Sequence, residues 1–354
     1  MLLLPVRSFI LAVMGALTLV GVSAAQMPRV GVVEHYGVHK LSLDQVNRAV
    51  GIAAGDSLSD DALAAAMKSA QARLSSLPGV EAAAVEAVCC LDHQLMIFAG
   101  LREAGVPGPR FLPAPQGTAR LPEEIARTSA PFDSLVGVAV INGDAAEDDA
   151  QGHALSHAPA LRAIQNRYLE FARASLDSLR IVLRTAADPR QRAIAAQVIA
   201  YAPDKRDVVG DLVAAAHDPD DGVRNNAVRA LAVIAVLAER EPARGIVVPA
   251  TPFVDLLGSV VWSDLNKSAM ALDRITSSVR DPALMVALEP RVLVLADMAR
   301  WRSPGHARPA FNILGRVAGL QEQAIADAWD QGDREKVIAA ALSSSRRVRQ
   351  TMER

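Results

Sequence analysis

The chain has 354 residues, a length that allows about two domains. Hydrophobic residues make up 51% of it but aromatic residues only 4%, so alanine, leucine and valine must fill the core, and this favours closely packed helices. The formal net charge of −2 argues against a general nucleic-acid-binding protein, which would carry a basic surface opposite the phosphates.

The first 25 residues have the pattern of a secretory signal peptide. Arg7 supplies the positive start, residues 9–22 carry no charge, and the small residues 23–25 suit cleavage before Gln26. The apolar run is shorter than the ~20 residues of a membrane-spanning helix. We therefore expect a periplasmic or secreted mature chain with no stable membrane span, and retention of the segment as an anchor is the alternative.

Residues 26–104 predict a small mixed domain. Residues 30–38 are rich in β-branched and aromatic residues and predict a strand. Ser42 is expected to cap a first helix and Ser59 a second one. Residues 80–90 and 94–101 flank a short turn and predict a β-hairpin. The expected order is therefore βααββ.

This order resembles a POTRA domain, a small periplasmic module of outer-membrane assembly and secretion proteins and of some division proteins. The resemblance is carried by KLSLDQVNRAVGIAAGDSLS (40–59), ARLSSLPGVEAAAVE (72–86) and LMIFAGLREAG (95–105). It implies an exposed sheet edge that can accept a partner strand. POTRA domains commonly precede a membrane β-barrel, but the residues after 105 lack the repeated alternating strands of a barrel, so barrel function is not implied.

The only two cysteines, Cys89 and Cys90, are adjacent. Neighbouring residues of an extended strand point to opposite faces, so we expect no disulfide between them. One should be buried and the other more exposed, while a redox or intermolecular role is left open.

Residues 105–121 predict a semi-rigid linker, because four prolines lie between Pro107 and Pro115 with glycines among them. Helical patterns return at Pro122. Residues 143–152 predict an acidic loop.

Two segments are near copies of each other: DPRQRAIAAQVIA (188–200) and DPDDGVRNNAVRALAVIA (218–235). The shared positions are Asp188, Pro189 and Arg192 in the first, and Asp218, Pro219 and Arg224 in the second. Each Asp-Pro pair predicts a helix start, with the aspartate as the cap and the proline at the first helical position. The two arginines lie 32 residues apart (224 − 192), and we expect each to reach an aspartate of its own or the adjacent repeat.

Apolar stripes at i, i+3, i+4 and i+7 recur from residue 160 to 345 and predict antiparallel pairs of amphipathic helices. The stripe at 194–202 is paired with that at 208–216, and the stripe at 227–235 with that at 253–261. A helical unit that recurs cannot bury its apolar face alone and must stack on its neighbours. Residues 122–345 therefore predict an α-solenoid, and they resemble HEAT-like repeats of the short type found in phycobilisome-lyase-like proteins. Lys267 and Arg308 are expected at places equivalent to the two arginines.

Motifs for catalysis, cofactors or metals are weak in this sequence. His153 and His157 follow the acids at 147–149, but these residues predict a solvated loop rather than a metal site. His35 and His39 are interpreted as surface residues and the three tryptophans, Trp262, Trp301 and Trp329, as packing anchors. The basic tail, 346–354, is interpreted as a solvated helix end. We expect neither a cofactor nor a metal.

Two functions remain. The first is a non-catalytic scaffold or adaptor of the cell envelope, which binds protein partners through the helical-repeat surface and a sheet edge. Asn225, Asn226 and Arg229 are the candidate partner-binding residues, because two successive asparagines are unfavourable inside a helix. For the asparagines, the alternative is that one caps a neighbouring backbone group and the other is merely exposed. The alternative is an enzyme built on HEAT-like repeats, such as a bilin lyase.

Overall fold

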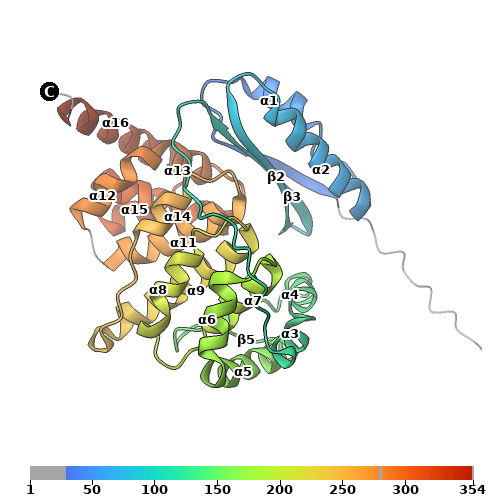
Figure 1. The fold of residues 1–354 in the computed structure, drawn as a ribbon. Coiled ribbons are helices and arrows are strands. Elements are labelled where there is room, and N and C mark those ends of the chain that lie inside the picture. Colours follow the sequence, from blue (N-terminus) through green and yellow to red (C-terminus); the bar gives the residue numbers. More distant parts are fainter. Residues whose placement is uncertain (1–28, 279–280, 353–354) are drawn as a thin grey trace, which may run out of the picture.

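The computed structural model describes residues 29–278 and 281–352 (Figure 1). The predicted signal peptide, 1–25, lies outside these residues, and the side chains of the basic tail, 346–354, lie outside those described. In the part of the chain that is described, every helix is too short or too polar to cross a membrane.

The N-terminal part has the expected βααββ order. Its elements are β1 (Val30–Tyr36), α1 (Leu43–Val50), α2 (Asp60–Ser75), β2 (Val80–Leu91) and β3 (Gln94–Glu103). The sheet order is β1-β3-β2, with β3 parallel to β1 and antiparallel to β2. Helices α1 and α2 lie together on one face of this sheet (Figure 1).

Local sequence signals set the ends of the two helices. Ser42 and Gln45 form a capping box at the start of α1, in which each side chain bonds the other residue's backbone N–H. Gly51 ends the helix in the left-handed region, at a φ of 61°. Ser59 caps α2 by accepting a hydrogen bond from the backbone N–H of Ala62, so both predicted caps are confirmed.

The cysteine prediction is wrong. Asp92 and His93, both at positive φ, form the turn between β2 and β3, which is one residue shorter than the predicted turn at 91–93 because β2 continues to Leu91. Just before this turn, Cys89 and Cys90 are joined in a disulfide, and both residues are exposed. The expectation assumed an extended trans backbone, whereas the peptide bond between the two cysteines is cis.

The rest of the chain is helical. The first helices are α3 (Glu123–Ser129), α4 (Phe132–Ile141), α5 (Pro159–Ala174), α6 (Leu176–Thr185), α7 (Pro189–Ile199), α8 (Arg206–Ala215) and α9 (Asp221–Arg240). They are followed by α10 (Thr251–Leu256), α11 (Trp262–Ser278), α12 (Pro282–Leu288), α13 (Val292–Ala299), α14 (Pro304–Val317), α15 (Glu322–Asp330) and α16 (Arg334–Met352). A small hairpin, β4 (Glu147–Asp148) and β5 (Leu155–Ser156), interrupts the predicted acidic loop, and two 3-10 turns lie at Pro242–Arg244 and Glu289–Arg291.

The helices stack as a repeat array. Helices α7, α9, α11 and α14 form one row in which each packs on the next, and α6, α8, α10 and α13 each pack beside one member of it. The helical repeat is therefore confirmed, but the predicted pairing is shifted by one helix. The stripe at 208–216 belongs to α8, which packs mainly on α9 rather than α7, and the stripe at 253–261 includes α10, which packs on α11.

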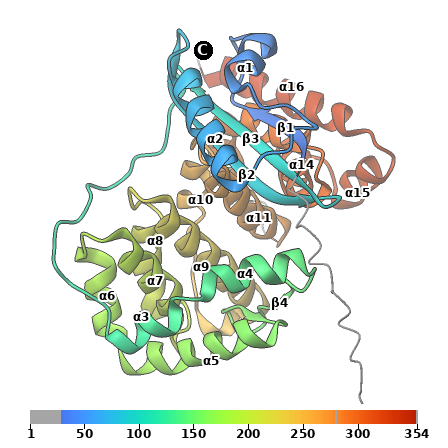
Figure 2. The same cartoon turned by 90° about the vertical axis from the view of Figure 1, so that its right-hand side faces the viewer.

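The second face of the sheet is docked on the helical array. Tyr36 and Phe98 belong to the same buried cluster as the array, and Phe98 lies 4.8 Å from the ring of Trp301 and 5.3 Å from that of Trp262. Trp301 also contacts Tyr36. The tryptophans are packing anchors, as predicted, but Trp262 and Trp301 anchor the sheet. This face of the sheet therefore belongs to the core of the array, whereas the opposite face forms a second core with α1 and α2 (Figures 1 and 2).

Hydrogen bonds surround this aromatic contact. The Tyr36 hydroxyl donates to the carbonyl of Val260 (2.7 Å), and the backbone N–H of Gly37 donates to Asp297 Oδ2 (2.8 Å). The backbone N–H of Trp262 donates to Glu86 Oε1 (2.7 Å). Burial raises the pKa of Glu86 to about 7, although this hydrogen bond favours the ionised form. The docked interface therefore contains a carboxyl group that titrates near neutral pH.

Residues 105–121 are not a free linker. They run in an extended conformation along the helices, where the backbone N–H of Leu112 donates to the His217 carbonyl (2.7 Å). Gly117 exchanges backbone hydrogen bonds with Thr185 and Ala187 (both 2.8 Å). The prolines keep this segment out of helices, as predicted, and these backbone hydrogen bonds hold it against the repeat array.

Candidate functional site

Arg192 and Arg224 are buried and each reaches an aspartate, so the prediction of inter-repeat ion pairs is confirmed. Arg192 makes a bidentate contact with Asp218 (2.8 and 2.7 Å) and donates to the carbonyls of Ala186 and Ala187. Asp218 precedes the next helix of the row, so this pair joins consecutive repeats.

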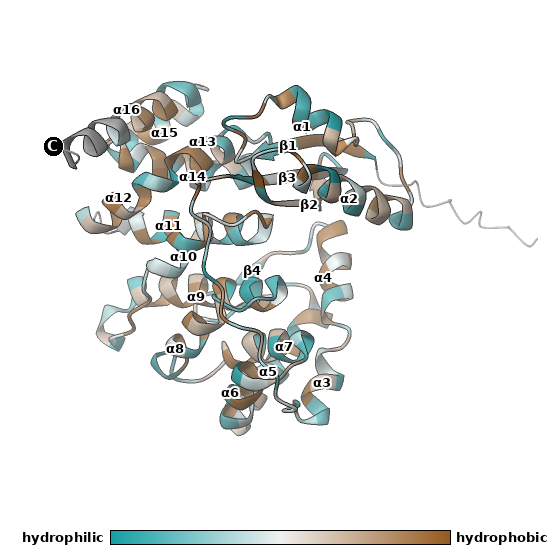
Figure 3. Cartoon of the chain, turned by 45° about the horizontal axis from the view of Figure 1, so that its top comes forward, coloured by the Kyte–Doolittle hydropathy of each residue, from teal (hydrophilic) through white to brown (hydrophobic). Residues whose placement is uncertain are grey.

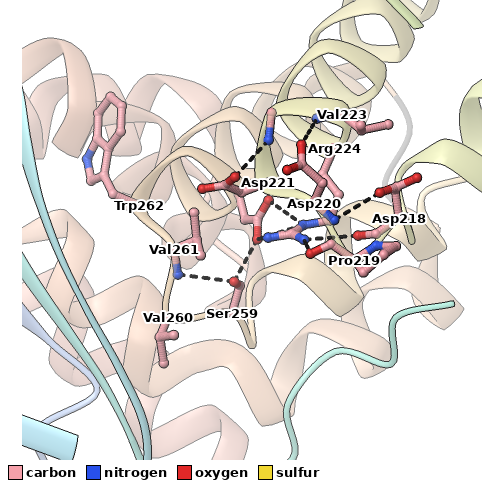
Figure 4. Close-up of polar contacts among 12 residues, drawn as sticks. Asp218, Pro219, Asp220, Asp221, Val223, Arg224, Ser259, Val260, Val261 and Trp262 are labelled. Carbon is pink, nitrogen blue, oxygen red and sulfur yellow. Dashed lines mark hydrogen bonds and ion pairs between the residues drawn. The ribbon is translucent and has the colours of Figure 1, made fainter. Parts of the chain in front are cut away.

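Arg224 repeats the arrangement one step along the array (Figure 4). Its guanidinium donates to the carboxylate of Asp264, at 2.8 Å for the shortest contact, and to the carbonyls of Asp218 and Pro219. Ser259 donates a further hydrogen bond to Asp264 (2.7 Å). Burial raises the pKa of Asp264 despite the neighbouring cation, so the ionised carboxylate depends on Arg224. The ring of Phe111 lies 4.1 Å from the guanidinium carbon and covers it.

The Asp-Pro pairs have two different roles. Asp188 caps α7 by accepting from the backbone N–H of Arg190, and Pro189 occupies the first turn, as predicted. In the second copy the cap is Asp220, so the prediction for Asp218 and Pro219 is wrong. The side chain of Asp218 instead pairs with Arg192. The second copy has two more residues between its Asp-Pro pair and its arginine, and its helix starts two residues later.

The later positions also differ from the prediction. Lys267 makes no such ion pair within residues 29–278 and 281–352, and Arg308 is exposed over the ring of Trp329. The next buried arginine is Arg316, which contacts Asp273 (2.6 Å). Arg192, Arg224 and Arg316 pair with Asp218, Asp264 and Asp273. The sequence did not identify these aspartates because each belongs to another repeat.

These ion pairs are structural. The guanidinium groups of Arg192 and Arg224 each contact one carboxylate and two backbone carbonyls, and neither residue lines the two cavities described below. A buried ion pair that is satisfied in this way fixes the register of neighbouring repeats rather than binding a partner.

A cavity of about 370 Å³ lies on the other side of α9 and contains the predicted partner-binding residues. Asn225, Asn226 and Arg229 line it together, with α4 forming the opposite wall through Val136 and Ala139. Apolar side chains make up most of α4, coloured brown in Figure 3, and Figure 2 shows the helix on the same side of the array as the sheet. The sequence-predicted residues therefore share one concave site.

The three residues are not equally free. The Asn226 side chain donates to the carbonyl of Ala193 (3.0 Å) and so joins α9 to α7, which gives it a structural role. Asn225 bonds only the neighbouring asparagine (3.3 Å). Arg229 pairs with Glu147 of β4, which closes the β4–β5 hairpin over the cavity. Asn225 and Arg229 remain the best-placed of the three for a partner.

Sequence reasoning missed Lys267 and Arg274 as members of this site. Lys267 lines the 370 Å³ cavity, and both residues line an adjoining one of about 270 Å³, which also contains Glu147 and Arg229. Burial, and then the cation of Arg229, lowers the pKa of Lys267. Their spacing of seven residues on an amphipathic helix would have placed them on one face, but the sequence did not show that this face is concave.

The structure places His153 and His157 in different surroundings. The segment from His153 to His157 is not helical, and His157 is exposed. His153 is half-buried against the ring of Tyr201, so the prediction of a fully solvated loop is wrong for this residue. Burial lowers its pKa to about 4. Across the described ranges, the histidines, cysteines and acids form no cluster that could hold a metal ion.

No protein-family model matches the chain, and no curated protein matches it. Three solved structures resemble part of it, each over 53% of this chain. An engineered protein is 22% identical over 90% of its own length (TM-score 0.34), and a designed armadillo repeat protein in complex with the peptide (KR)4 is 18% identical over 95% (TM-score 0.34). A computationally designed armadillo repeat protein for modular peptide recognition is 16% identical over 94% (TM-score 0.33).

Global likeness at this level carries no argument about function. The fold assignment rests on the stacked helices themselves and on their inter-repeat ion pairs. The chain is a mainly helical repeat protein with a small mixed sheet docked on its array.

Proposed function

We propose that this protein is a non-catalytic scaffold that holds a segment of another protein on the concave side of its repeat array. The observation that carries the proposal is the cavity between α4, α9 and α11, which is lined by amide and charged side chains rather than filled by packing. A helical repeat array presents such a surface along several units, so an extended peptide can contact more than one repeat.

The free sheet edge is the second proposed surface. Strand β2 is at the edge of the sheet, and its outer side makes no backbone hydrogen bond to another strand within the described ranges. A partner strand could add there, as the POTRA resemblance implies. We further propose that the N-terminal part is a POTRA-like module, that the array is of the HEAT-like type, and that the protein acts in the periplasm or outside the cell; the apolar start of the sequence supports this location.

Site-specific photo-crosslinking in the native host tests the concave site. A photoreactive amino acid replaces Asn225, whose side chain makes no hydrogen bond to another helix within the described ranges. In a control it replaces Glu170, an exposed residue of α5 outside the cavity. We expect a polypeptide adduct in the envelope fraction from position 225 and none from position 170. The absence of an adduct at 225, or equal adducts at both positions, would contradict the proposal.

The enzyme alternative is tested with the same purified protein. A bound chromophore, or turnover of a bilin substrate that survives replacement of the residues around Asn225, would replace the scaffold proposal with a catalytic one.

A further inference from the structure

Lys267 differs from the buried arginines of this protein because it lacks a partner. Arg192, Arg224 and Arg316 are each paired with a carboxylate, whereas Lys267 makes no hydrogen bond or ion pair with any described residue. It is only partly exposed and lies beside another cation, Arg229. An ammonium group in this setting loses solvation without gaining a partner, so the apo protein carries an uncompensated cost there.

The second unpartnered cation of the site lies on the same face of α11. Arg274 is exposed, has no ion pair within the described ranges, and follows Lys267 by seven residues. Two helical turns separate the Cα atoms by about 10 Å, at 1.5 Å per residue. Met270 lies between the two cations and is also exposed, so α11 offers two positive positions with an apolar position between them.

The protein already places one carboxylate in this site. Glu147, on the short β4–β5 hairpin, pairs with Arg229 and accepts a hydrogen bond from the Gln165 side chain (3.4 Å). It lines both cavities, next to Lys267. The ion pair between Glu147 and Arg229 shows that a carboxylate at this cavity can bind a cation of α9.

We propose that the groove between α9 and α11 binds an acidic peptide segment, and that Lys267 and Arg274 each form an ion pair with a carboxylate of the ligand. The inference rests on the proposed scaffold function and names the class of its partner. Glu147 then acts as an internal competitor that holds Arg229 in the absence of the peptide.

A peptide fits this lining better than a nucleic acid does. Glu147 and Asp149 also line the groove, so a chain with a phosphate on every unit would bring its negative charges against them. Spaced carboxylates can avoid the two acids and still reach the cations, and Asn225 can bond the peptide backbone. Met270 and Val233 provide apolar contact between these polar positions.

Fluorescence anisotropy with a labelled eight-residue peptide that alternates glutamate and alanine tests the proposal, using the full-length mature protein. We expect saturable binding, and about hundredfold weaker binding of the same peptide with glutamine in place of glutamate, since it loses two charge-assisted contacts that contribute about tenfold each. Lys267→Gln and Arg274→Gln each remove one of these contacts and should each weaken binding by about tenfold. Arg190→Gln, which removes an exposed arginine outside the groove, should leave the dissociation constant unchanged.

Glu147→Gln tests whether Glu147 competes with the peptide for Arg229. This variant should bind the glutamate peptide more tightly, by about threefold or more, because the competitor has lost its charge, whereas Glu170→Gln, which removes an exposed carboxylate outside the groove, should leave the affinity unchanged. Circular dichroism and thermal unfolding establish that each variant is folded. Equal affinity for the two peptides, or unchanged affinity in Lys267→Gln, would overturn the proposal, and so would binding of a single-stranded oligonucleotide through these residues without binding of the peptide.

The two proposals fail in different ways. A polypeptide captured from position 225 together with no preference for the glutamate peptide refutes the acidic ligand and leaves the scaffold function standing. Failure of both experiments refutes both.

Discussion

Replacing Arg224 by methionine should destabilise the protein strongly. The arginine and its partner Asp264 are 2% and 1% exposed, and the guanidinium also satisfies the carbonyls of Asp218 and Pro219. Methionine keeps a long unbranched stem and good helix propensity, so the change removes mainly the polar contacts. It leaves Asp264 with the hydrogen bond from Ser259 alone. Loss of one partner of a buried ion pair costs about 3–5 kcal/mol, a large part of the 5–15 kcal/mol that stabilises a typical domain.

Urea unfolding followed by circular dichroism measures this loss, and hydrogen exchange at α9 and α11 localises it, because repeat arrays can open in parts. The double variant Arg224→Met/Asp264→Leu should recover most of the stability, since no unpaired charge remains in the core. Arg206→Met is the matched surface control. It removes an exposed arginine paired with Asp204, and we expect no measurable change.

The stability of Arg224→Met should depend on pH in a direction set by Asp264. Burial raises the pKa of Asp264 in the folded protein, so the folded state takes up a proton more readily than the unfolded chain does. Without Arg224 this effect grows, and the stability of Arg224→Met should fall as the pH rises from about 4 towards neutrality. The deficit against the wild type should therefore be smallest in acid. A deficit below about 1 kcal/mol at pH 7, or one that does not change with pH, would refute this account of the pair.

Three further variants test the sheet interface and the α7–α9 contact. The pKa of Glu86 rises to about 7 on folding, so the folded wild type loses stability between about pH 4.5 and 7. Glu86→Gln should show a weaker fall in this range and be more stable than the wild type above pH 7. A pKa shift of this size corresponds to about 3 kcal/mol, and unfolding curves at several pH values measure it. Trp301→Ala should cost about 3–5 kcal/mol and expose residues 105–121 to proteolysis by loosening the sheet, and an unchanged cleavage pattern would contradict docking through this side chain. Asn226→Ala should cost about 1 kcal/mol in urea unfolding through loss of its bond to Ala193, and an equal cost for Asn225→Ala would show that this bond is not the reason.

Helix positions could be predicted from the sequence because their signals are local. Ser42, Gly51 and Ser59 act within one turn of the helix ends, and the same holds for Asp188. The pairing of the helices was wrong because an apolar stripe shows that a face is buried but not which neighbour buries it. The acidic partner Asp264 lies 40 residues from Arg224, and no local rule connects the two.

The sequence of β3 contains a signal for the docking of the sheet. Residues 95–101 in β3 are apolar without interruption, whereas a sheet with one solvated face should alternate apolar and polar residues. An unbroken apolar strand indicates cover on both faces. One face of β3 is covered by α1 and α2, and the other by Trp262 and Trp301. Because the sheet is docked on the array, residues 105–121 connect two parts in contact and lie along the helices.

Two charged residues of α11 differ in whether an ion pair offsets the cost of their burial. Lys267, which is partly buried and has no ion-pair partner among the described residues, follows the buried and paired Asp264 by three positions. If Lys267 is kept for a ligand, its replacement by methionine should stabilise the free protein while it weakens binding of an acidic peptide. Burial lowers the pKa of this lysine, so the charged form destabilises the folded state at neutral pH. The gain in stability should therefore be present at pH 7 and should shrink as the pH approaches the ordinary lysine pKa. Thermal and urea unfolding at pH 7 and 10 measure it, with Arg190→Gln as the neutral control. Loss of stability in Lys267→Met at pH 7 would show that the ammonium group supports the fold, and the argument for a reserved ligand position would then be wrong.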